Sequence, residues 1–518
     1  MDLGFWAIAA ADPGRVAVID AHGIETTFGE LRDRADAIAR GWRSLGLDRG
    51  DGVAMVLPNV PSFFAAYLAA MSSGLYLTPV NSHLAAPEIA HVISDCEARS
   101  VLVHADLAER SAPGVDQAGI AGDARFADPA AHGYQPLDDL IALGRAEPAL
   151  PEGLGAGAMM MYTSGTTGKP KGVRRALPEA DPNELFGRLG EIYCTGFGIT
   201  PGSGVHLVCG PLYHAGPSAS ATNALHVGNT VALMDRWTPE GCLDAIERLR
   251  VTSTQMVPTM FHRLLALPPA ERSRRDLSSL QSVMHTGAPC PMTIKQRLMD
   301  WLGPVVYETY GGTESVATIA TPKRWLAKPG TVGRPIRGVT LHILDDDGNE
   351  CPVGVAGAIY VEHAMATGME YFKDPDKTRS MRRGNLVTLG DVGYLDEDGF
   401  LFLRDRKVDM VISGGVNIYP AEVEAVLLQC DLVGDAAVIG VPDEELGEIV
   451  LAIVEPAVPA SDGDETAVAI LDFCNDRLAR FKHPRRVELV ERLPRLPNGK
   501  IEKRRLREPY WEGHKRRI

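Results

Sequence analysis

The chain has 518 residues, of which 45% are hydrophobic and 23% charged, the composition of a soluble globular protein with more than one core. Its 52 Lys and Arg residues against 67 Asp and Glu residues give a formal net charge of −15. This balance argues against nucleic acid or an anionic membrane surface as the main partner. A polyanionic substrate would therefore need local basic groups.

The cysteines and the N-terminus indicate the compartment. The eight cysteines are scattered, with no Cys-x-x-Cys pair and no His cluster at metal-ligand spacing, so we expect reduced thiols in a cytoplasmic protein. No basic region followed by an apolar run opens the chain, and the most apolar stretch, residues 63–80, is interrupted by Ser72, Ser73, Gly74 and Pro79. Neither a signal peptide nor a membrane span is expected.

The first predicted elements alternate between helices and short strands. Thr27 and Glu30 match a capping box, and apolar residues then recur at helical spacing up to Gly46. A short apolar run at 53–57, an alanine-rich helix at 62–71 and another apolar run at 100–103 follow. Buried strands that alternate with helices predict a parallel sheet.

The same alternation returns later, and each strand ends at a turn with polar residues: "VHLVCGPLYHAG", "STQMVPT", "SVMHTGAP" and "VVYETYGGTE". In doubly wound sheets, ligands lie beyond the carboxyl ends of the strands, so these turns are the expected site. Residues 330–405 instead predict an antiparallel subdomain, with turns at "DDDGN" and "DEDG". After "DRKVD" a small α/β unit is expected, with strands at 437–441 and 449–454 and a helix at 465–481.

These patterns predict two domains of an α/β protein. A large N-terminal domain of doubly wound mixed sheets would span 1–406, including the β-rich part at 330–405, and a small C-terminal domain would span 407–518.

The stretch "MMMYTSGTTGKPKGVRR" raises the question of a phosphate loop. A Walker loop is excluded, because Gly168-Lys169 is followed by Pro170 and the position five before Gly168 is Thr163. The glycines would still let the backbone approach an anion, the hydroxyls could donate to phosphate oxygens and the lysines would supply charge. A surface turn is the alternative that the composition leaves open.

The full string "YTSGTTGKPKGV" resembles the phosphate loop of the adenylate-forming superfamily, which contains acyl-CoA synthetases, adenylation domains of peptide synthetases and firefly luciferase. Six further blocks resemble that family's cores in the family's order: "PLYHAGP", "TGAP", "YETYGGTE", "LGDVGYLDEDGFL", "LRDRKVDMVISGGVNIYPAEVE" and "LPNGKIEKRRLR". Together with a general likeness of the N-terminal region, the resemblance covers essentially the whole chain. It implies the adenylate-forming fold with a mobile C-terminal domain.

The resemblance implies a role for each matching position. Lys500 would be the catalytic lysine, His214 would lie beside the acyl carboxylate, Thr313 near the α-phosphate, and Glu314 would bind Mg²⁺. Tyr310 would stack on adenine, Asp391 would bind the ribose hydroxyls and Arg406 would contact ribose or phosphate. The implied ATP- and AMP-binding set is Thr163, Ser164, Gly165, Thr166, Thr167, Gly168, Lys169, Lys171, Gly287, Ala288, Pro289, Tyr310, Gly311, Gly312, Asp391 and Arg406, and Gly414 and Gly415 are the implied coenzyme A contacts.

Several of these positions have a plainer interpretation. Lys500 could be one more cation of a basic tail, Glu314 an acid at a helix N-terminus, and His214 a hydrogen-bonded histidine at a strand end. Asp391 could cap a turn, and the Gly414–Gly415 pair could serve a hairpin alone. The ordered blocks favour the functional interpretation in each case.

The resemblance implies an enzyme that uses ATP and Mg²⁺ to activate a carboxylic acid as acyl-AMP and then transfers the acyl group to coenzyme A. Largely small or apolar residues at 218–225, 255–265 and 288–292 predict a hydrophobic acid, and likeness to bacterial fatty-acyl-CoA synthetases favours a fatty acid. An aryl or steroid-like ring-bearing acid, a carrier protein as acceptor, luciferase-like oxygenation and a nucleotide-binding sensor are the alternatives. A homodimer is a guess from the family.

Two positions depart from the family pattern. Val408 stands where the hinge usually has Lys or Asp, so the identity of the pivot is open. Val416 follows the glycine pair where many relatives have Glu, which weakens the case for a polar contact there.

Overall fold

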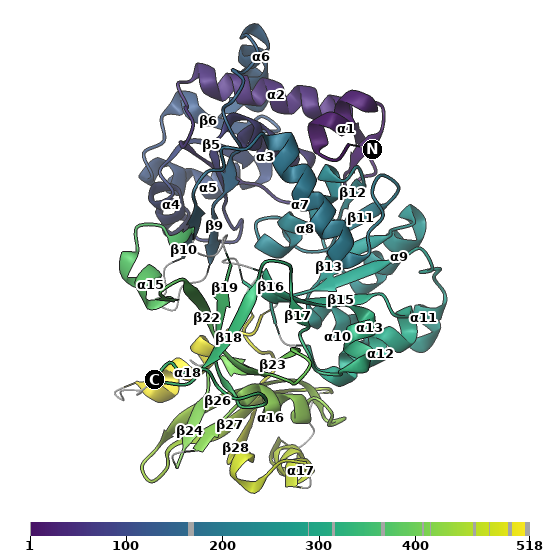
Figure 1. Ribbon diagram of the computed structural model, residues 1–518, viewed down its shortest axis with the longest axis vertical. Coiled ribbons are helices and arrows are strands. Elements are labelled where there is room, and N and C mark those ends of the chain that lie inside the picture. The colour runs from purple at the N-terminus through teal and green to yellow at the C-terminus, as the bar shows by residue number, and fades with distance from the viewer. Residues whose placement is uncertain are drawn as a thin grey trace.

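The computed structural model describes residues 2–163, 170–288, 290–312, 316–363, 368–406, 409–414, 416–458, 463–475, 477–495 and 500–512, with the backbone alone at 405, 406 and 417. The N-terminal two thirds of the chain form the upper body in Figure 1, and the C-terminal elements lie together at its lower end.

The first sheet carries the carboxyl-terminal strand edge predicted from the sequence. Strands β1, β12, β11, β13, β14 and β15 are parallel along it, and β2, β16 and β17 pair antiparallel at its two ends. The α/β class and the parallel sheet are thereby confirmed. The strands in spatial order are β17 Arg334–Pro335, β16 Val316–Ala320, β15 Val306–Gly311, β14 Ser282–His285, β13 Ser253–Met256, β11 Val205–Val208, β12 Thr230–Leu233, β1 Val16–Ile19 and β2 Glu25–Thr27.

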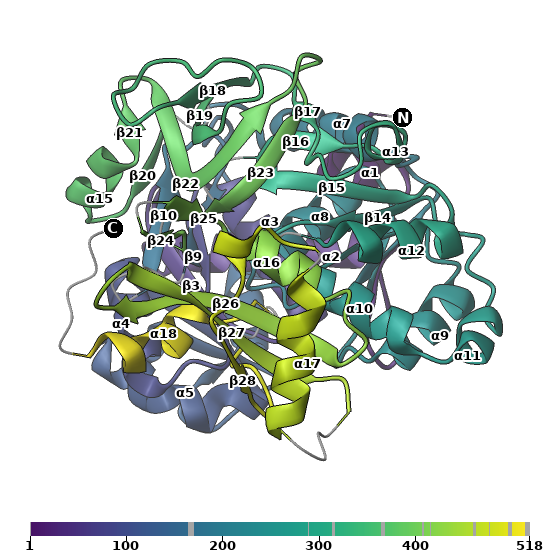
Figure 2. The same cartoon turned by 90° about the horizontal axis from the view of Figure 1, so that it is seen from below.

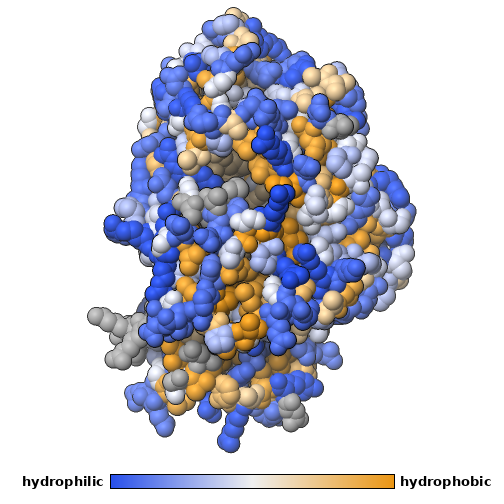
Figure 3. All heavy atoms as spheres, in the orientation of Figure 1, coloured by the Kyte–Doolittle hydropathy of each residue, from blue (hydrophilic) through white to orange (hydrophobic). Residues whose placement is uncertain are grey.

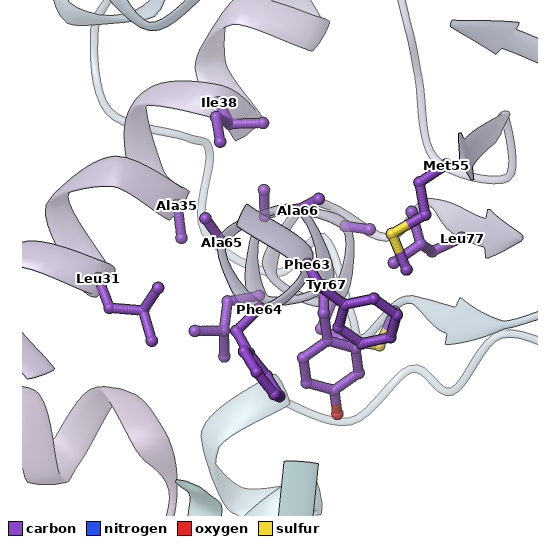
Figure 4. Close-up of a cluster of buried hydrophobic side chains, with 14 of the residues drawn as sticks. Leu31, Ala35, Ile38, Met55, Phe63, Phe64, Ala65, Ala66, Tyr67 and Leu77 are labelled. Carbon is purple, nitrogen blue, oxygen red and sulfur yellow. The ribbon is translucent and has the colours of Figure 1, made fainter. Parts of the chain in front are cut away.

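A second, all-parallel sheet lies beside it and shares its main hydrophobic core. Figure 4 shows how α2 and α3 fill this core: Leu31 and Ile38 of α2 face the α3 helix, whose Phe63 and Phe64 are at most 1% exposed. The predicted capping box is present, since Glu30 N donates to Thr27 Oγ1 and Thr27 N donates to Glu30. The strands in spatial order are β7 Gln135–Pro136, β6 Arg125–Asp128, β5 Ala98–His104, β3 Gly52–Val56, β4 Tyr76–Pro79 and β8 Ala158–Met159.

Two antiparallel sheets follow, as the turn signals at "DDDGN" and "DEDG" predict. The turn at Asp345 is held by its carboxylate, which accepts from Gly348 N and Asn349 N. One sheet contains β20 Met369–Tyr371, β10 Lys171–Arg175 and β9 Met161–Thr163. The other contains β18 Thr340–Leu344, β19 Gly357–Glu362, β22 Leu386–Leu395, β21 Arg382–Arg383 and β23 Leu401–Arg406.

The elements after residue 408 form a separate sheet with helices on it, which we call the lid (residues 409–512 as described). Figure 2 shows the lid's strands and α16, α17 and α18 gathered on one side of the molecule. The helix predicted at 465–481 is too long: α17 ends at Asn475, and Arg480–Lys482 form a 3₁₀ turn. The lid strands are β25 Val416–Ile418, β24 Val411–Ser413, β27 Gly447–Pro456, β26 Val433–Asp443 and β28 Arg486–Leu489.

The helices flank the sheets, and α8 packs against β11, β12 and β13. None within the described part of the chain is long and apolar enough to cross a bilayer. Their bounds are α1 Phe5–Ala11, α2 Phe28–Ser44, α3 Pro61–Ser73, α4 Ala86–Asp95, α5 Ala105–Gln117, α6 Leu137–Ala146, α7 Pro182–Phe197, α8 Ala215–His226, α9 Pro239–Leu249, α10 Pro258–Ala266, α11 Pro269–Ser273, α12 Met292–Leu302, α13 Pro322–Ala327, α15 Pro375–Ser380, α16 Pro420–Leu427, α17 Gly463–Asn475 and α18 Lys503–Trp511.

A buried histidine in β11 makes the stability of the fold depend on pH. His206 is 1% exposed, lies 3.0 Å from Ser253 Oγ, and burial lowers its pKa to about 3. Below pH 6.5 the His206 side chain becomes protonated in the unfolded chain but stays neutral in the folded chain. Protonation of this residue should therefore lower the unfolding free energy by about 1 kcal/mol per pH unit. Urea denaturation between pH 7 and 5 should give a shallower pH slope for His206→Gln than for the wild type. Parallel slopes would contradict the assignment.

Candidate active site

A single continuous cavity of about 2310 Å³ opens at the carboxyl ends of the parallel strands of the first sheet. Its wall includes Cys209 after β11, Val257 after β13 and Thr286 after β14. This is the edge at which the sequence predicts ligand binding. Of the predicted site residues, His214, Gly287, Gly311, Gly312 and Lys500 line this cavity.

The lid places Lys500 in the cavity, against the turn after β14. Gly287 there has φ 88°, and a Cβ atom on it would lie 3.4 Å from Lys500 Cε and 3.8 Å from Lys500 Nζ. A side chain at Gly287 would be strained by the positive φ, and its Cβ atom would be in van der Waals contact with the lysine. The structure thus brings together two predicted residues that are 213 positions apart in the sequence, on the two sides of the predicted domain boundary.

His214 lies at the start of α8, beside the same ammonium group. Burial, reinforced by the positive charges of Lys500 and His83, lowers its pKa to about 4. Its ring is 4.6 Å from the ring of Tyr213, and Nε2 is buried without a hydrogen-bond partner. At neutral pH it is therefore an uncharged imidazole whose Nε2 is available to a ligand group.

The ends of β14 and β15 meet through a hydrogen bond between their turns. Thr286 Oγ1 donates to the carbonyl of Thr309, at 3.1 Å, and both residues line the cavity. The predicted turn "TGAP" contained Thr286, but the predicted set of site residues took only Gly287, Ala288 and Pro289 from it and left out the Thr286 hydroxyl. Ala288 is not part of the cavity wall.

Tyr310 and Asp391 are joined directly. The Tyr310 hydroxyl donates to Asp391 Oδ2, at 2.9 Å, and Tyr310 is only 6% exposed. The β22–β23 register pairs Asp391 with Arg406, so the three predicted nucleotide contacts come from one small region. Neither Tyr310 nor Asp391 is part of the cavity wall in this arrangement of the chain.

The strands on either side of the predicted phosphate loop pair with each other. Lys171 in β10 is opposite Thr163 in β9 in an antiparallel pair. Lys171 forms an ion pair with Asp374, which also lowers the pKa of that carboxyl group. Neither Thr163 nor Lys171 is part of the cavity wall.

Several predicted site residues lie outside the described residues. They are Ser164, Gly165, Thr166, Thr167, Gly168 and Lys169 of the loop, together with Pro289, Thr313, Glu314 and Gly415, and the hinge position Val408. Among the described residues, no group of three or more His, Cys, Asp or Glu side chains could hold a metal ion. Binding of Mg²⁺ through Glu314 therefore stays a prediction.

Gly414 occupies a tight hairpin of the lid. Ser413 pairs with Val416 across the turn, Gly414 has φ 56°, and its N–H donates to the Leu446 carbonyl at 2.8 Å. The positive φ explains the glycine by backbone geometry alone. A coenzyme A contact at this turn stays a prediction.

Arg495 connects the lid to the large domain close to Lys500. It forms an ion pair with Asp435 of β26, and its Nη1 donates to Thr259 Oγ1 at the start of α10, at 3.4 Å. Two further lid cations are paired within the lid, Lys482 with Glu422 and Lys503 with Glu424. These two stabilise the lid itself in this arrangement.

The acid pocket differs partly from the sequence prediction. Ser218 and Asn223 of α8 and Met256 at the end of β13 line the cavity as expected, whereas no described residue of 288–292 does. Helix α7, which no prediction singled out, contributes Leu189, Ile192 and their neighbours. Apolar residues at helical spacing in the segment 185–197 were the signal that could have found it.

Comparison with known proteins identifies the family. Residues 5–372 match the family model described as AMP-binding enzyme, and residues 422–500 match its C-terminal domain. The chain belongs to the AMP-binding enzyme family, the adenylate-forming enzymes.

Individual relatives match almost end to end. A feruloyl-CoA synthase of Amycolatopsis is 34% identical over 98% of this chain and 98% of its own length. The long-chain-fatty-acid–CoA ligase FadD13 of Mycobacterium tuberculosis is 30% identical over 94% of this chain and 93% of its own. The structure of the amide bond synthetase McbA from Marinactinospora thermotolerans superposes with a TM-score of 0.83 at 29% identity, covering 98% of this chain and 99% of that one.

Proposed function

We propose that the protein is an AMP-forming acyl-CoA synthetase that activates a hydrophobic carboxylic acid, with a fatty acid as the favoured substrate. The observation that carries the proposal is Lys500, which enters the cavity from the lid and lies beside the Gly287 turn and neutral His214. The named CoA ligases among the relatives support coenzyme A as the acceptor. ATP, Mg²⁺ and coenzyme A are the cofactors of this family of ligases.

The first half-reaction brings two anions together. A carboxylate oxygen forms a bond to the α-phosphorus of ATP, and the bond to the departing pyrophosphate breaks. Lys500 neutralises charge on both partners, and His214, being uncharged, holds the carboxylate through Nε2 without adding charge. Gly287 keeps the backbone clear for the nucleotide, and the Tyr310–Asp391 pair presents an acceptor to the ribose hydroxyls.

In the second half-reaction the thiol sulfur bonds to the acyl carbon, AMP leaves and the thiol proton passes to solvent. For this step we propose that the lid rotates, Lys500 withdraws and Gly414 and Gly415 approach the pantetheine. We place the boundary between the large domain and the mobile C-terminal domain between residues 406 and 407. This division is supported by the sheet change between β23, which ends at Arg406, and β24, which begins at Val411.

For Thr313 and Glu314 we propose contacts to the α-phosphate and to Mg²⁺. For the loop Thr163–Lys171 and Ala288–Pro289 we propose ATP contacts. A cytoplasmic location is supported by eight free cysteines, and a homodimer is proposed from the family alone.

A substrate panel tests the function. Purified protein with ATP, Mg²⁺ and coenzyme A should release AMP and pyrophosphate with fatty acids and form the thioester, detected by mass spectrometry. Feruloyl- and benzoyl-type acids serve as the competing substrates. If turnover occurred only with a carrier protein or an amine, that molecule would be the acyl acceptor in place of coenzyme A. If no acid were turned over, the proposed function would be wrong.

A further inference from the structure

Positively charged side chains gather where helices α10 and α12 meet the lid. Burial lowers the pKa of His262 on α10, and the positive charges of Arg297 on α12, Arg495 of the lid and Arg263 on α10 lower it further. Burial and the charge of Arg263 also lower the pKa of Arg495. Because salt screens charges that are more than about 10 Å apart, these side chains lie close together. We call Arg263, Arg297 and Arg495 the arginine cluster.

One face of α10 places the arginine cluster at the cavity. Thr259 and Arg263 are four residues apart, so they lie on the same face of the helix, and both line the cavity. Arg495 Nη1 donates to Thr259 Oγ1 on this face, at 3.4 Å. Figures 1 and 2 both draw α10 next to the lid. The cluster therefore lies where the cavity wall meets the lid.

Two members of the arginine cluster have no carboxylate partner. Arg495 forms an ion pair with Asp435, whereas Arg263 and Arg297 are exposed and form no ion pair within the part of the chain that the structure describes. Glu455 of the lid acts on the pKa of the neighbouring histidine in the opposite direction, but it forms no ion pair with the cluster either. The chain as a whole has a formal net charge of −15. Adjacent arginines without a carboxylate in such a chain point to an anion from outside it.

Coenzyme A is the anion whose chemistry fits this position. The largely uncharged pantetheine arm separates its phosphate groups from its thiol, so the phosphates bind away from the reacting carbon. Figure 3 shows hydrophobic side chains in the hollow of the face it presents and hydrophilic side chains around that hollow, an arrangement that suits the arm inside and the phosphates outside. The phosphates of ATP are proposed to lie at the loop Thr163–Lys171 and near Lys500, which leaves the cluster to the second substrate. Arginine forms paired, charge-assisted hydrogen bonds to phosphate oxygens.

We propose that Arg263 and Arg297 bind a phosphate group of coenzyme A at the edge of the cavity. The inference rests on the proposed function and assigns the part of the second substrate that the proposed function leaves unplaced. Both arginines belong to the large domain, so they stay beside the cavity when the lid rotates, whereas Arg495 leaves with the lid. The site is therefore present during the second half-reaction, in which the thiol attacks.

Thioester formation from supplied acyl-AMP tests the site in the full-length enzyme. Arg263→Gln and Arg297→Gln should each raise the KM for coenzyme A about tenfold, the usual effect of losing one charge-assisted hydrogen bond, and Arg263→Lys should raise it less. Pantetheine carries no phosphate, so its KM should be the same in these variants as in the wild type. Arg248→Gln is the matched control, because Arg248 is an exposed arginine of α9 that is not part of the cavity wall. It should leave the KM for coenzyme A unchanged.

Dephospho-coenzyme A and pyrophosphate exchange complete the test. Dephospho-coenzyme A lacks only the 3′-phosphate, so a KM that the variants leave unchanged assigns the site to that group, and a KM that rises as for coenzyme A assigns it to the pyrophosphate. A KM for coenzyme A within twofold of the wild type in both Gln variants, an equal rise for pantetheine, or a rise in the KM for ATP in pyrophosphate exchange would overturn the site and leave the acyl-CoA synthetase standing. Absence of thioester from coenzyme A with every acyl-AMP would overturn the proposed function and the site together.

Discussion

Replacing Lys500 with alanine is expected to slow acyl-adenylate formation by about 10²–10³-fold, the usual cost of removing one preorganised electrostatic group from a transition state. Lys500 is a lid cation that lies against Gly287, and its charge adds to burial in lowering the pKa of His214. Without the lysine, less positive charge would offset the repulsion between the carboxylate and the α-phosphate as they approach. Pyrophosphate exchange measures this step directly.

The second half-reaction separates a catalytic loss from a folding defect. When synthetic acyl-AMP and coenzyme A are supplied, Lys500→Ala should form thioester at close to the wild-type rate, because the lysine is not needed for thiol attack. Arg505→Ala, which removes an exposed cation of α18, is the matched control and should leave both steps unchanged. Full pyrophosphate exchange by Lys500→Ala would remove the lysine from the mechanism.

Predictions from the sequence are most accurate where contacts between residues close together in the chain determine the structure. The capping box at Thr27 and Glu30 fixes the start of α2, and the Asp345 turn depends on a side chain bonding to its own neighbours. Both signals act within a few residues of the chain. The end of α17 was misplaced because the residues after Asn475 continue an apolar pattern without continuing the helix.

Features that arise from long-range packing could not be predicted in this way. Motif resemblance named Lys500 and Gly287 separately, but their contact depends on how the lid packs against the large domain. The cavity face of α7 depends on Gly187 packing on Leu3, more than 180 residues earlier in the sequence. Likewise, nothing in the spacing pairs Lys171 with Asp374.

The buried ion pair beneath the turns after β14 and β15 is another contact of this kind. Lys295 of α12 is 0% exposed, its Nζ lies 2.7 Å from Glu308 Oε2 on β15, and it also lies over the Trp325 ring. Burial raises the pKa of Glu308, and the charge of Lys295 opposes that rise. The pair joins α12, which follows the Gly287 turn, to the strand that leads into Gly311 and Gly312.

Lys295→Met is expected to destabilise the protein by about 3–5 kcal/mol, because it leaves the Glu308 carboxyl group buried without its cation. The double variant Lys295→Met/Glu308→Leu should recover most of that loss, since an apolar pair of similar volume needs no charge compensation. Urea denaturation of the single and double variants measures both changes. The exposed Arg250–Asp276 pair, at 2.6 Å, is the control, and Arg250→Ala should cost less than about 1 kcal/mol.

A Lys295→Met protein as stable as the wild type would mean that the folded protein tolerates a lone carboxyl group at Glu308. The ion pair would then not be what holds α12 and β15 together under the site.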